Sequence, residues 1–452
     1  MVRIKNLSKI KIKKYMPSKE IIDSSPVSDI SGTIDIPGDK SISHRALLLG
    51  AMAEGETTAN GFLNGEDCIA TMEALTCLGV RFELKDTDLK VISRGIKNFI
   101  PPRKELDLGN SGTGMRLLMG ILSSAPFSSK LTGDSSLLSR PMERIAKPLR
   151  MMGARIKTSN GRPPVEITGS SKLKAISYSL PVSSAQLKSA ILLASLSSEG
   201  LTKVTSPGIS RDHTERMLKA MGIKIDCSDT ISLLGPQKIK PSKLNIPRDF
   251  SSASFFIVAG LIGSERGILI PKVNVNDTRI GLLEILNNMG ANLQILNKKK
   301  IGSEYIADIF VRKSNLKGVK VDSSLVSLSI DELPILFIAA AYAKGVTEVM
   351  GASELRYKES DRLSAMSRGL EEVGVRNEER QDGIIIYGGP IKGGTVNSFG
   401  DHRVAMSFII AGIKAEGNLS VYNTKSIDTS FPNFVDTACR LGLKVGKRVS
   451  SI

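Results

Sequence analysis

Apolar residues along the chain gather into six stretches with the periodicity of a helix, and a short polar or glycine-containing segment directly precedes each stretch. One anchor residue in each of these segments recurs at intervals of 65 to 82 residues. The anchors are Asp39, Asn110, Ser184, Asp249, Asp331 and Asp401. A recurrence at this spacing is typical of a repeated architecture, in which each repeat is one supersecondary unit.

A second helix is expected in every unit, and it ends at a glycine 38 to 43 residues after the anchor. Glycine at this point suits a left-handed helix C-cap, and the residues that follow alternate between apolar and polar as a strand does. Each unit is therefore predicted to be a strand–helix–strand–helix–strand–strand repeat of roughly 70 residues. The six glycines are Gly79, Gly153, Gly222, Gly290, Gly374 and Gly442.

These units predict an α/β protein of two domains with three repeats each, which suits a chain of 452 residues. A strand candidate at residues 32–37 precedes the first anchor. We therefore expect the chain to cross between domains near Asp39 and again near Arg248. The prediction is an inserted domain at residues 39–248 and a discontinuous domain at residues 1–38 and 249–452, with a basic tail at residues 1–20.

No apolar stretch reaches the roughly 18 residues that a membrane span needs. The four cysteines are too widely spaced for a zinc site or a disulfide framework, and no apolar signal-peptide core is present near the first residue. These features predict a cytoplasmic protein without a membrane or metal partner, and we expect a monomer.

The net charge of +17 raises the alternative of a nucleic-acid-binding protein. Residues 1–20 alone hold seven Lys or Arg against one Glu, and a remnant organellar targeting segment is a second interpretation of this tail. Aromatic residues make up only 4% of the chain and Trp is absent, so stacking surfaces for single strands are scarce. Small anionic substrates explain the remaining charge better than nucleic acid does.

The polar segments before the helices are suited to bind small anions, because a helix N-terminus offers free N–H groups and a partial positive charge. Lys40 and Arg45 add cations to the first segment, and Arg116 follows the glycine-rich run that begins at Asn110. For Asp249 and Asp331, helix capping alone is the favoured interpretation. Arg216 and Glu215 are compatible with a solvated helix face.

Nine short motifs, taken together, resemble the motif series of the EPSP synthase family of enolpyruvyl transferases, in the family's order. They are DKSISHRALLLGA, LGNSGTGMRLL, SRPM, SSAQ, SRDHTERML, IDELPIL, LRYKESDRL, GDHRVAMSF and TSFPNF. The resemblance runs from about residue 36 to 434 and is closest to the second class of the family. It implies two hinged, inverse α/β domains of three repeats each, which agrees with the independent repeat analysis.

The resemblance implies transfer of the enolpyruvyl group of phosphoenolpyruvate to the 5-hydroxyl of shikimate 3-phosphate, on the pathway to chorismate and the aromatic amino acids. Phosphate leaves through a tetrahedral intermediate, and neither a metal nor an organic cofactor is required. Asp331 is implied as the base for the 5-hydroxyl, Glu359 as the group that moves a proton at the methylene carbon, and Lys40 as a third catalytic residue.

The binding residues follow from the same motifs. Those for shikimate 3-phosphate are Lys40, Ser41, Arg45, Ser184, Ala185, Gln186, Arg211, Asp331 and Lys358. Those for phosphoenolpyruvate are Lys40, Asn110, Gly112, Arg140, Gln186, Arg362, His402 and Arg403. A hydrogen-bonded structural role remains an equal alternative for His402.

Two departures from the family pattern affect these expectations. Thr429 stands where the commoner form of the family has a lysine, so one cation of the phosphoenolpyruvate site is absent or comes from elsewhere. Gly112 stands where glyphosate-tolerant members of the second class have alanine, which predicts sensitivity to glyphosate.

The closest rival is the sister carboxyvinyltransferase that acts on UDP-N-acetylglucosamine. That enzyme has a reactive cysteine in a loop of its first domain, whereas residues 133–137 of this chain read GDSSL. A nucleic-acid-binding or scaffold protein built on the same repeats would leave the carboxylates Asp331 and Glu359 unexplained.

Overall fold

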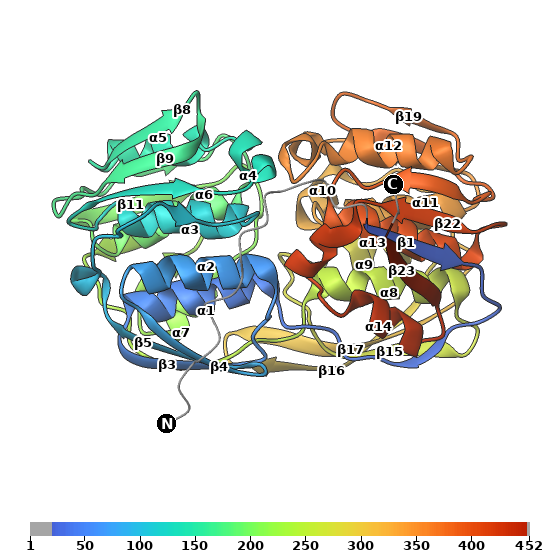
Figure 1. The fold of residues 1–452 in the computed structure, drawn as a ribbon, viewed down its shortest axis with the longest axis horizontal. Coiled ribbons are helices and arrows are strands. Elements are labelled where there is room, and N and C mark those ends of the chain that lie inside the picture. Colours follow the sequence, from blue (N-terminus) through green and yellow to red (C-terminus); the bar gives the residue numbers. More distant parts are fainter. Residues whose placement is uncertain (1–19, 450–452) are drawn as a thin grey trace.

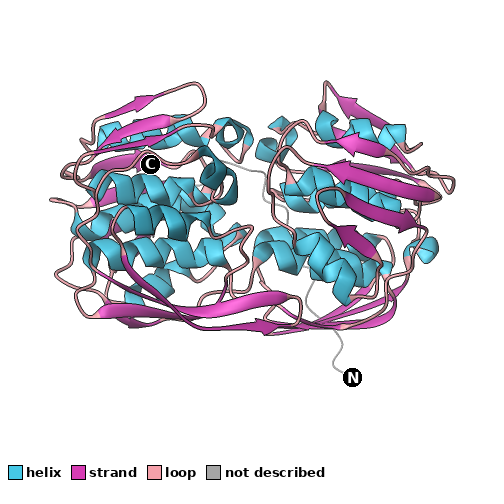
Figure 2. Ribbon diagram, turned by 180° about the vertical axis from the view of Figure 1, so that it is seen from behind, coloured by secondary structure: helices cyan, strands magenta, loops and turns pink. Residues whose placement is uncertain are grey.

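The computed structural model describes residues 20–449, so the basic tail predicted at residues 1–20 lies almost entirely outside the described residues. Figure 1 shows two halves side by side, in which helices lie inside and strands lie mainly at the outer rim. We call residues 39–248 the inserted half and the other described residues the outer half. Figure 2 shows the same arrangement from behind.

Buried apolar side chains form two separate cores. One core draws its members from residues 42–246, and the other from residues 22–36 and 250–443. In the second core, α8 (Phe250–Gly263) is buried on all sides, as is α11 (Leu333–Tyr342) up to its last residue. These two helices contact each other and α13 (His402–Ala411), so three apolar helices form the centre of the outer half.

Three four-stranded sheets cover the helices of the inserted half. Their strands are β3 (Glu54–Asn60), β4 (Arg81–Lys85), β5 (Asp88–Arg94), β6 (Leu106–Asp107), β7 (Ser128–Thr132), β8 (Arg155–Ser159), β9 (Arg162–Thr168), β10 (Ser177–Ser179), β11 (Gly200–Thr205), β12 (Ile225–Cys227), β13 (Ile231–Gly235) and β14 (Lys243–Asn245). The helices are α1 (Lys40–Met52), α2 (Glu66–Cys77), α3 (Gly112–Leu122), α4 (Ser135–Ser139), α5 (Glu143–Met151), α6 (Ala185–Ser195) and α7 (His213–Ala220), with the short 3₁₀ helix η1 (Ile96–Asn98).

The outer half repeats this plan with two four-stranded sheets and one three-stranded sheet among the described residues. Its strands are β1 (Glu20–Ser25), β2 (Ser31–Thr33), β15 (Gly267–Asn274), β16 (Asn292–Ile301), β17 (Glu304–Arg312), β18 (Val346–Val349), β19 (Asn377–Glu379), β20 (Ile384–Tyr387), β21 (Gly394–Asn397), β22 (Leu419–Tyr422) and β23 (Lys444–Val449). Its remaining helices are α9 (Gly281–Asn288), α10 (Ser323–Leu328), α12 (Arg362–Glu372), α14 (Phe434–Arg440), η2 (Ser353–Tyr357), η3 (Gly412–Lys414) and η4 (Thr424–Thr429).

The sheets show one feature that the repeat pattern does not predict: the first and the fourth units exchange a strand. The strand before α1, β2, pairs with β15 of the outer half, whereas the strand before α8, β14, pairs with β3 of the inserted half. The sheet of the last unit is completed by β1 from the start of the described chain, which lies between β22 and β23. The pairing of β1 with β23 joins the two ends of the described chain in one sheet.

The six predicted C-cap glycines all adopt positive φ angles, between +84° and +109°, which confirms the left-handed conformation expected from their spacing. A strand follows within a few residues of each of them, as at β4 after Gly79 and β8 after Gly153. Among residues 20–449, no helix is long and apolar enough to span a membrane.

Candidate active site

A cavity of about 100 Å³ lies between the two halves, and both halves supply its walls. Nine Lys or Arg side chains but only four carboxylates line it. Because removing a cation from water is costly and a nearby anion offsets that cost, this imbalance favours the binding of negatively charged ligands.

All the predicted site residues except Asn110 and Ser184 line this cavity. Those from the inserted half are Lys40, Ser41, Arg45, Gly112, Arg140, Ala185, Gln186 and Arg211. Those from the outer half are Asp331, Lys358, Glu359, Arg362, His402 and Arg403. The cavity also includes residues that the sequence did not assign to a binding role, namely Asp67, Thr113, Arg116, Asp249, Arg279 and Tyr357.

Four of the six anchor residues cap helices that begin at the cavity, namely Asp39, Ser184, Asp249 and Asp401. Asp39 accepts a hydrogen bond from the Ile42 amide of α1 (2.9 Å), and Ser184 accepts one from the Leu187 amide of α6 (3.3 Å). Ser184 is thus occupied as a cap and does not line the cavity. In the second unit the cap is Ser111, one residue after the predicted anchor.

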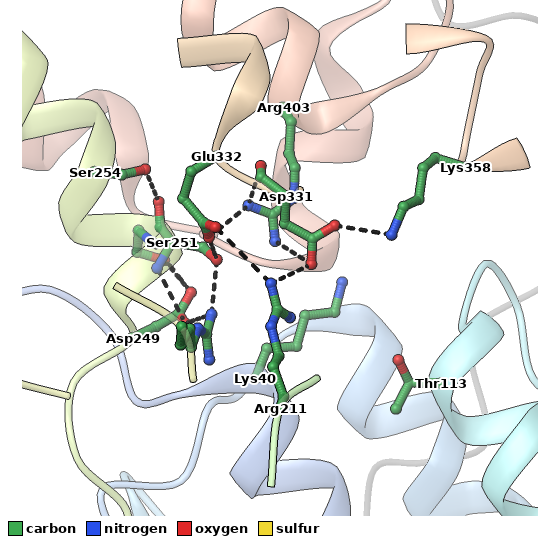
Figure 3. Close-up of polar contacts among 12 residues, drawn as sticks. Lys40, Thr113, Arg211, Asp249, Ser251, Ser254, Asp331, Glu332, Lys358 and Arg403 are labelled. Carbon is green, nitrogen blue, oxygen red and sulfur yellow. Dashed lines mark hydrogen bonds and ion pairs between the residues drawn. The ribbon is translucent and has the colours of Figure 1, made fainter. Parts of the chain in front are cut away.

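Asp331 does not cap its helix, so the capping interpretation favoured for it is wrong. The N-cap position of α11 is Glu332, whose side chain makes no capping hydrogen bond. The Asp331 carboxylate is instead held by Arg211 of the opposing half (2.7 Å) and by Lys358 (3.1 Å). Figure 3 shows Asp331 between these two side chains, with Arg403 beside it. Asp249, by contrast, does cap α8, and it also binds Arg279 (2.7 Å).

The charge state of Asp331 follows from these neighbours. Burial opposes its ionisation, but Lys358, Arg211 and other nearby cations outweigh burial and hold its pKa well below the ordinary aspartate range. Arg362 is one of these cations, with Nη1 3.3 Å from Asp331 and Nη2 2.5 Å from Glu359. One guanidinium therefore lies between the two carboxylates predicted to be catalytic.

Glu359 joins the two halves. Its Oε1 lies 3.6 Å from Arg140 Nη1, and its backbone carbonyl accepts a hydrogen bond from Ser136 Oγ (3.0 Å). Burial disfavours the charged carboxylate, but Arg362 and Arg140 outweigh this effect and keep the pKa of Glu359 well below its usual range. Both candidate catalytic groups are thus carboxylates at neutral pH.

Asn110 has a supporting position behind the cavity wall. Its Oδ1 accepts a hydrogen bond from Arg140 Nη2 (2.6 Å), and its Nδ2 donates one to Asp134 (2.8 Å). Gly112 brings the backbone close to the same arginine, since a Cβ at this position would lie 2.9 Å from Arg140 Nη1. Asn110 therefore orients Arg140 in this structure and does not line the cavity itself.

Arg45, which is buried, and Arg116, which is half-buried, are cations oriented by neutral groups. Arg45 donates to Thr214 (2.6 Å) and Ser189 (3.0 Å), and burial lowers its pKa to about 10, which leaves it charged at neutral pH. Arg116 donates to Gln186 Oε1 (2.5 Å), and burial together with the nearby arginines lowers its pKa to about 9. Neutral partners leave these two charges available to a ligand anion.

Lys40 and His402 also line the cavity. Lys40 pairs with Asp67 (2.6 Å), a contact that no sequence spacing indicates. Burial, reinforced by Lys40, holds the pKa of His402 well below that of an ordinary histidine, so its ring is neutral at pH 7. Thr429 does not line the cavity, and its hydroxyl donates to the Ser426 carbonyl (2.7 Å).

Comparison with known proteins shows the family of this chain. The family model described as EPSP synthase (3-phosphoshikimate 1-carboxyvinyltransferase) matches residues 24–438. The chain belongs to the EPSP synthase family. A 3-phosphoshikimate 1-carboxyvinyltransferase of Legionella pneumophila strain Lens is 49% identical over 425 residues, which cover 93% of this chain and 98% of that relative. One from Methylococcus capsulatus is 45% identical over 434 residues, or 95% and 99% of the two chains.

Solved structures confirm the predicted fold class of this family member. An EPSP synthase from Acinetobacter baumannii matches with a TM-score of 0.84 at 46% identity, covering 95% of this chain and all of that one. The enolpyruvyl transferase NikO from Streptomyces tendae matches with a TM-score of 0.80 at 17% identity, which is informative for the fold alone.

Proposed function

We propose that the cavity between the halves is the site at which this member of the EPSP synthase family transfers the enolpyruvyl group of phosphoenolpyruvate to the 5-hydroxyl of shikimate 3-phosphate. The observation that carries this proposal is the position of Arg362, whose Nη1 contacts Asp331 and whose Nη2 contacts Glu359. Two carboxylates bound by one guanidinium suit a reaction that needs a base at one substrate and a group that gives and takes back a proton at the other.

Shikimate 3-phosphate binds at the inserted-half side of the cavity in this proposal. The residues that contact it are Lys40, Ser41, Arg45, Ala185, Gln186, Arg211 and Lys358. Arg45 supplies a charge whose orientation is already fixed by Thr214 and Ser189. Ser184 contributes by capping α6, whose first residues Ala185 and Gln186 face the cavity.

Phosphoenolpyruvate lies beside it and is held by cations of both halves. Its proposed contacts are Lys40, Gly112, Arg140, Gln186, Arg362, His402 and Arg403. Asn110 takes part indirectly, by orienting Arg140. The ligand carries several negative charges, and charge-assisted hydrogen bonds from arginine are among the strongest that a protein offers.

Asp331 acts as the base for the 5-hydroxyl, and binding of the substrates strengthens it. In the free protein the surrounding cations hold its pKa low, after they have overcome the opposing effect of burial. When Arg211 and Lys358 turn to the substrate anions, the charge around Asp331 becomes less positive and its basicity rises. Glu359 is ionised in the free protein, and it takes up a proton from water once Arg140 and Arg362 turn to phosphoenolpyruvate and its pKa rises. It delivers this proton to the methylene carbon during addition and takes a proton back from the new methyl group as phosphate leaves, while the cations stabilise the tetrahedral intermediate.

Phosphorus NMR tests this function directly. A mixture of the protein with both substrates is expected to lose the phosphoenolpyruvate signal and gain inorganic phosphate, while the ring phosphate keeps its carbon attachment and shifts only slightly. Release of inorganic phosphate from the ring substrate, with phosphoenolpyruvate intact, would overturn the proposal.

We also propose that the two halves are domains that bend at the chain crossings, with boundaries after residues 38 and 248. The two hydrophobic cores share no residue and change over between Ile36 and Ile42 and between Ile246 and Phe250, which supports these boundaries. Arg279 binds Asp39 and Asp249, which cap the helices on either side of the crossings. Closure about these crossings would exclude water from the intermediate.

A further inference from the structure

An ion pair outside the cavity joins the two halves at its rim. Arg144 Nη1 of α5 lies 3.0 Å from Glu354 Oε2 and 3.2 Å from Oε1, and Glu354 belongs to η2 of the outer half. The two side chains are 21% and 37% exposed, and neither lines the cavity. The site chemistry described above uses neither of them.

Both partners lie on segments that also carry site residues. Arg144 follows Arg140 by four residues, and Glu354 precedes Glu359 by five. The same two segments meet inside the cavity, where Arg140 approaches Glu359 (3.6 Å) and Ser136 donates to the Glu359 carbonyl (3.0 Å). The two segments are therefore joined on both the inner and the outer side of the rim.

The segment that carries Glu354 is fixed firmly to the outer half. Arg356 donates to the carbonyls of Gln381 (2.7 Å) and Arg380 (2.6 Å), and it pairs with Asp361 (2.7 Å). Just before η2, the Ala352 amide donates to the Asp382 carbonyl (2.6 Å). Because the segment is held at both ends, the attraction between Arg144 and Glu354 acts on the outer half as a whole. Lys358 and Glu359 therefore move together with Glu354.

We propose that Arg144 and Glu354 are positioning residues that favour the closed arrangement of the halves and so hold Lys358 and Glu359 in place for catalysis. This inference rests on the proposed function. A partly exposed ion pair is weak, so its loss lowers the ratio of closed to open molecules only roughly two- to fivefold. An interaction of this strength holds the halves together during the reaction yet still permits product release.

Charge exchange tests the pair, with Arg144→Glu, Glu354→Arg and the double variant compared against wild type. Each single variant is expected to raise the KM of both substrates roughly three- to tenfold, with an unchanged melting temperature, and the double variant is expected to restore both values to within about twofold. Lys147→Glu makes the same charge reversal at an exposed position of α5 and should leave KM unchanged. A fall in melting temperature with normal KM, or single variants that the exchange does not rescue, would overturn the proposal.

Small-angle X-ray scattering gives a second readout that does not depend on activity. The single variants should have a larger radius of gyration than wild type, and the double variant should regain the wild-type value. Equal radii for all four proteins would reject the positioning role. A protein that shows this pattern but transfers no enolpyruvyl group would reject the proposed function alone.

Discussion

Four cations surround the Asp331 carboxylate, at 2.7 Å (Arg211), 3.1 Å (Lys358), 3.3 Å (Arg362) and 3.8 Å (Arg403). Arg211 comes from the inserted half, and the other three come from two segments of the outer half, residues 358–362 and the start of α13. Such a group is a weak base while the cations remain in place, because each of them stabilises its charged form. Its reactivity is therefore tied to the presence of substrate anions that compete for the same cations.

Replacement of Asp331 by Asn is expected to lower kcat by roughly 10²–10⁴, because the 5-hydroxyl loses its base. Binding of shikimate 3-phosphate should remain mostly intact, since Arg211 and Lys358 are released from their carboxylate partner. Calorimetric titration and steady-state kinetics measure the two effects separately. A variant with near-normal turnover would remove Asp331 from the role of base.

Gly112→Ala is expected to displace Arg140, because the new Cβ would lie 2.9 Å from Arg140 Nη1 in the present geometry. The loss of a charge-assisted hydrogen bond should raise the KM of phosphoenolpyruvate on the order of tenfold. The KM of shikimate 3-phosphate serves as the internal control and should change little. The same variant should be less sensitive to glyphosate than the wild type, whose predicted sensitivity depends on this glycine.

His44 predicts how stability depends on pH. Burial, reinforced by Lys40 and Arg45, holds its pKa well below that of an ordinary histidine. Below about pH 6.5, His44 therefore binds a proton in the unfolded chain but not in the folded protein. Proton binding stabilises the unfolded chain, so the free energy of unfolding decreases as the pH falls below this value. We expect the melting temperature to fall between about pH 7.5 and pH 5.5, and to fall less in His44→Gln. Identical slopes in the two proteins would contradict this.

The sequence predicted most cavity residues because they lie in compact motifs next to helix starts. It missed Asp67 and Arg279, which reach the site from other segments and pair with residues distant in sequence. Asp67 pairs with Lys40. Arg279 pairs with Asp39 and Asp249. The sequence placed Arg116 one helical turn after Gly112. The direction of its side chain, however, depends on how α3 packs against α6. Partners such as these depend on tertiary structure alone.

At the scale of elements, the helix ends were predictable because capping is local. The spacing identified every C-cap glycine, and Asp39, Ser184, Asp249 and Asp401 all cap helices as their residue type suggests. Asp331 departs from this rule because four nearby cations compete for its carboxylate. A local pattern indicates what a residue can do, and the charges around it decide which possibility is realised.

Gly290 tests the C-cap interpretation in isolation. Its φ angle is +86°, and an added Cβ would have no neighbour nearer than 4.0 Å, so Gly290→Ala introduces backbone strain without a clash. The free energy of unfolding is expected to fall by roughly 1 kcal/mol, measured by urea denaturation. Gly446→Ala is the matched control, since its Cβ would also be unobstructed but its backbone is that of an ordinary strand. Equal effects at the two positions would contradict the interpretation.

At the scale of the whole molecule, the repeat count and the two-domain α/β class were accessible from periodicity, but the strand exchange was not. The pairing of β2 with β15 and of β14 with β3 leaves the order of elements within the units unchanged, and therefore leaves no trace in the hydrophobic pattern. The assembly of one cavity from two halves likewise depends on how they meet. The monomeric state and the cytoplasmic location stay predictions.

The most direct test of the account is the KM of phosphoenolpyruvate in Arg140→Ala and Arg403→Ala, which remove one cation from each half. If both halves hold the same anion, each variant should raise this KM by roughly 10- to 100-fold, and by more than it raises the KM of shikimate 3-phosphate. If only one of the two changes the KM of phosphoenolpyruvate, or if both affect the two substrates equally, the halves do not share the anion and the account is wrong.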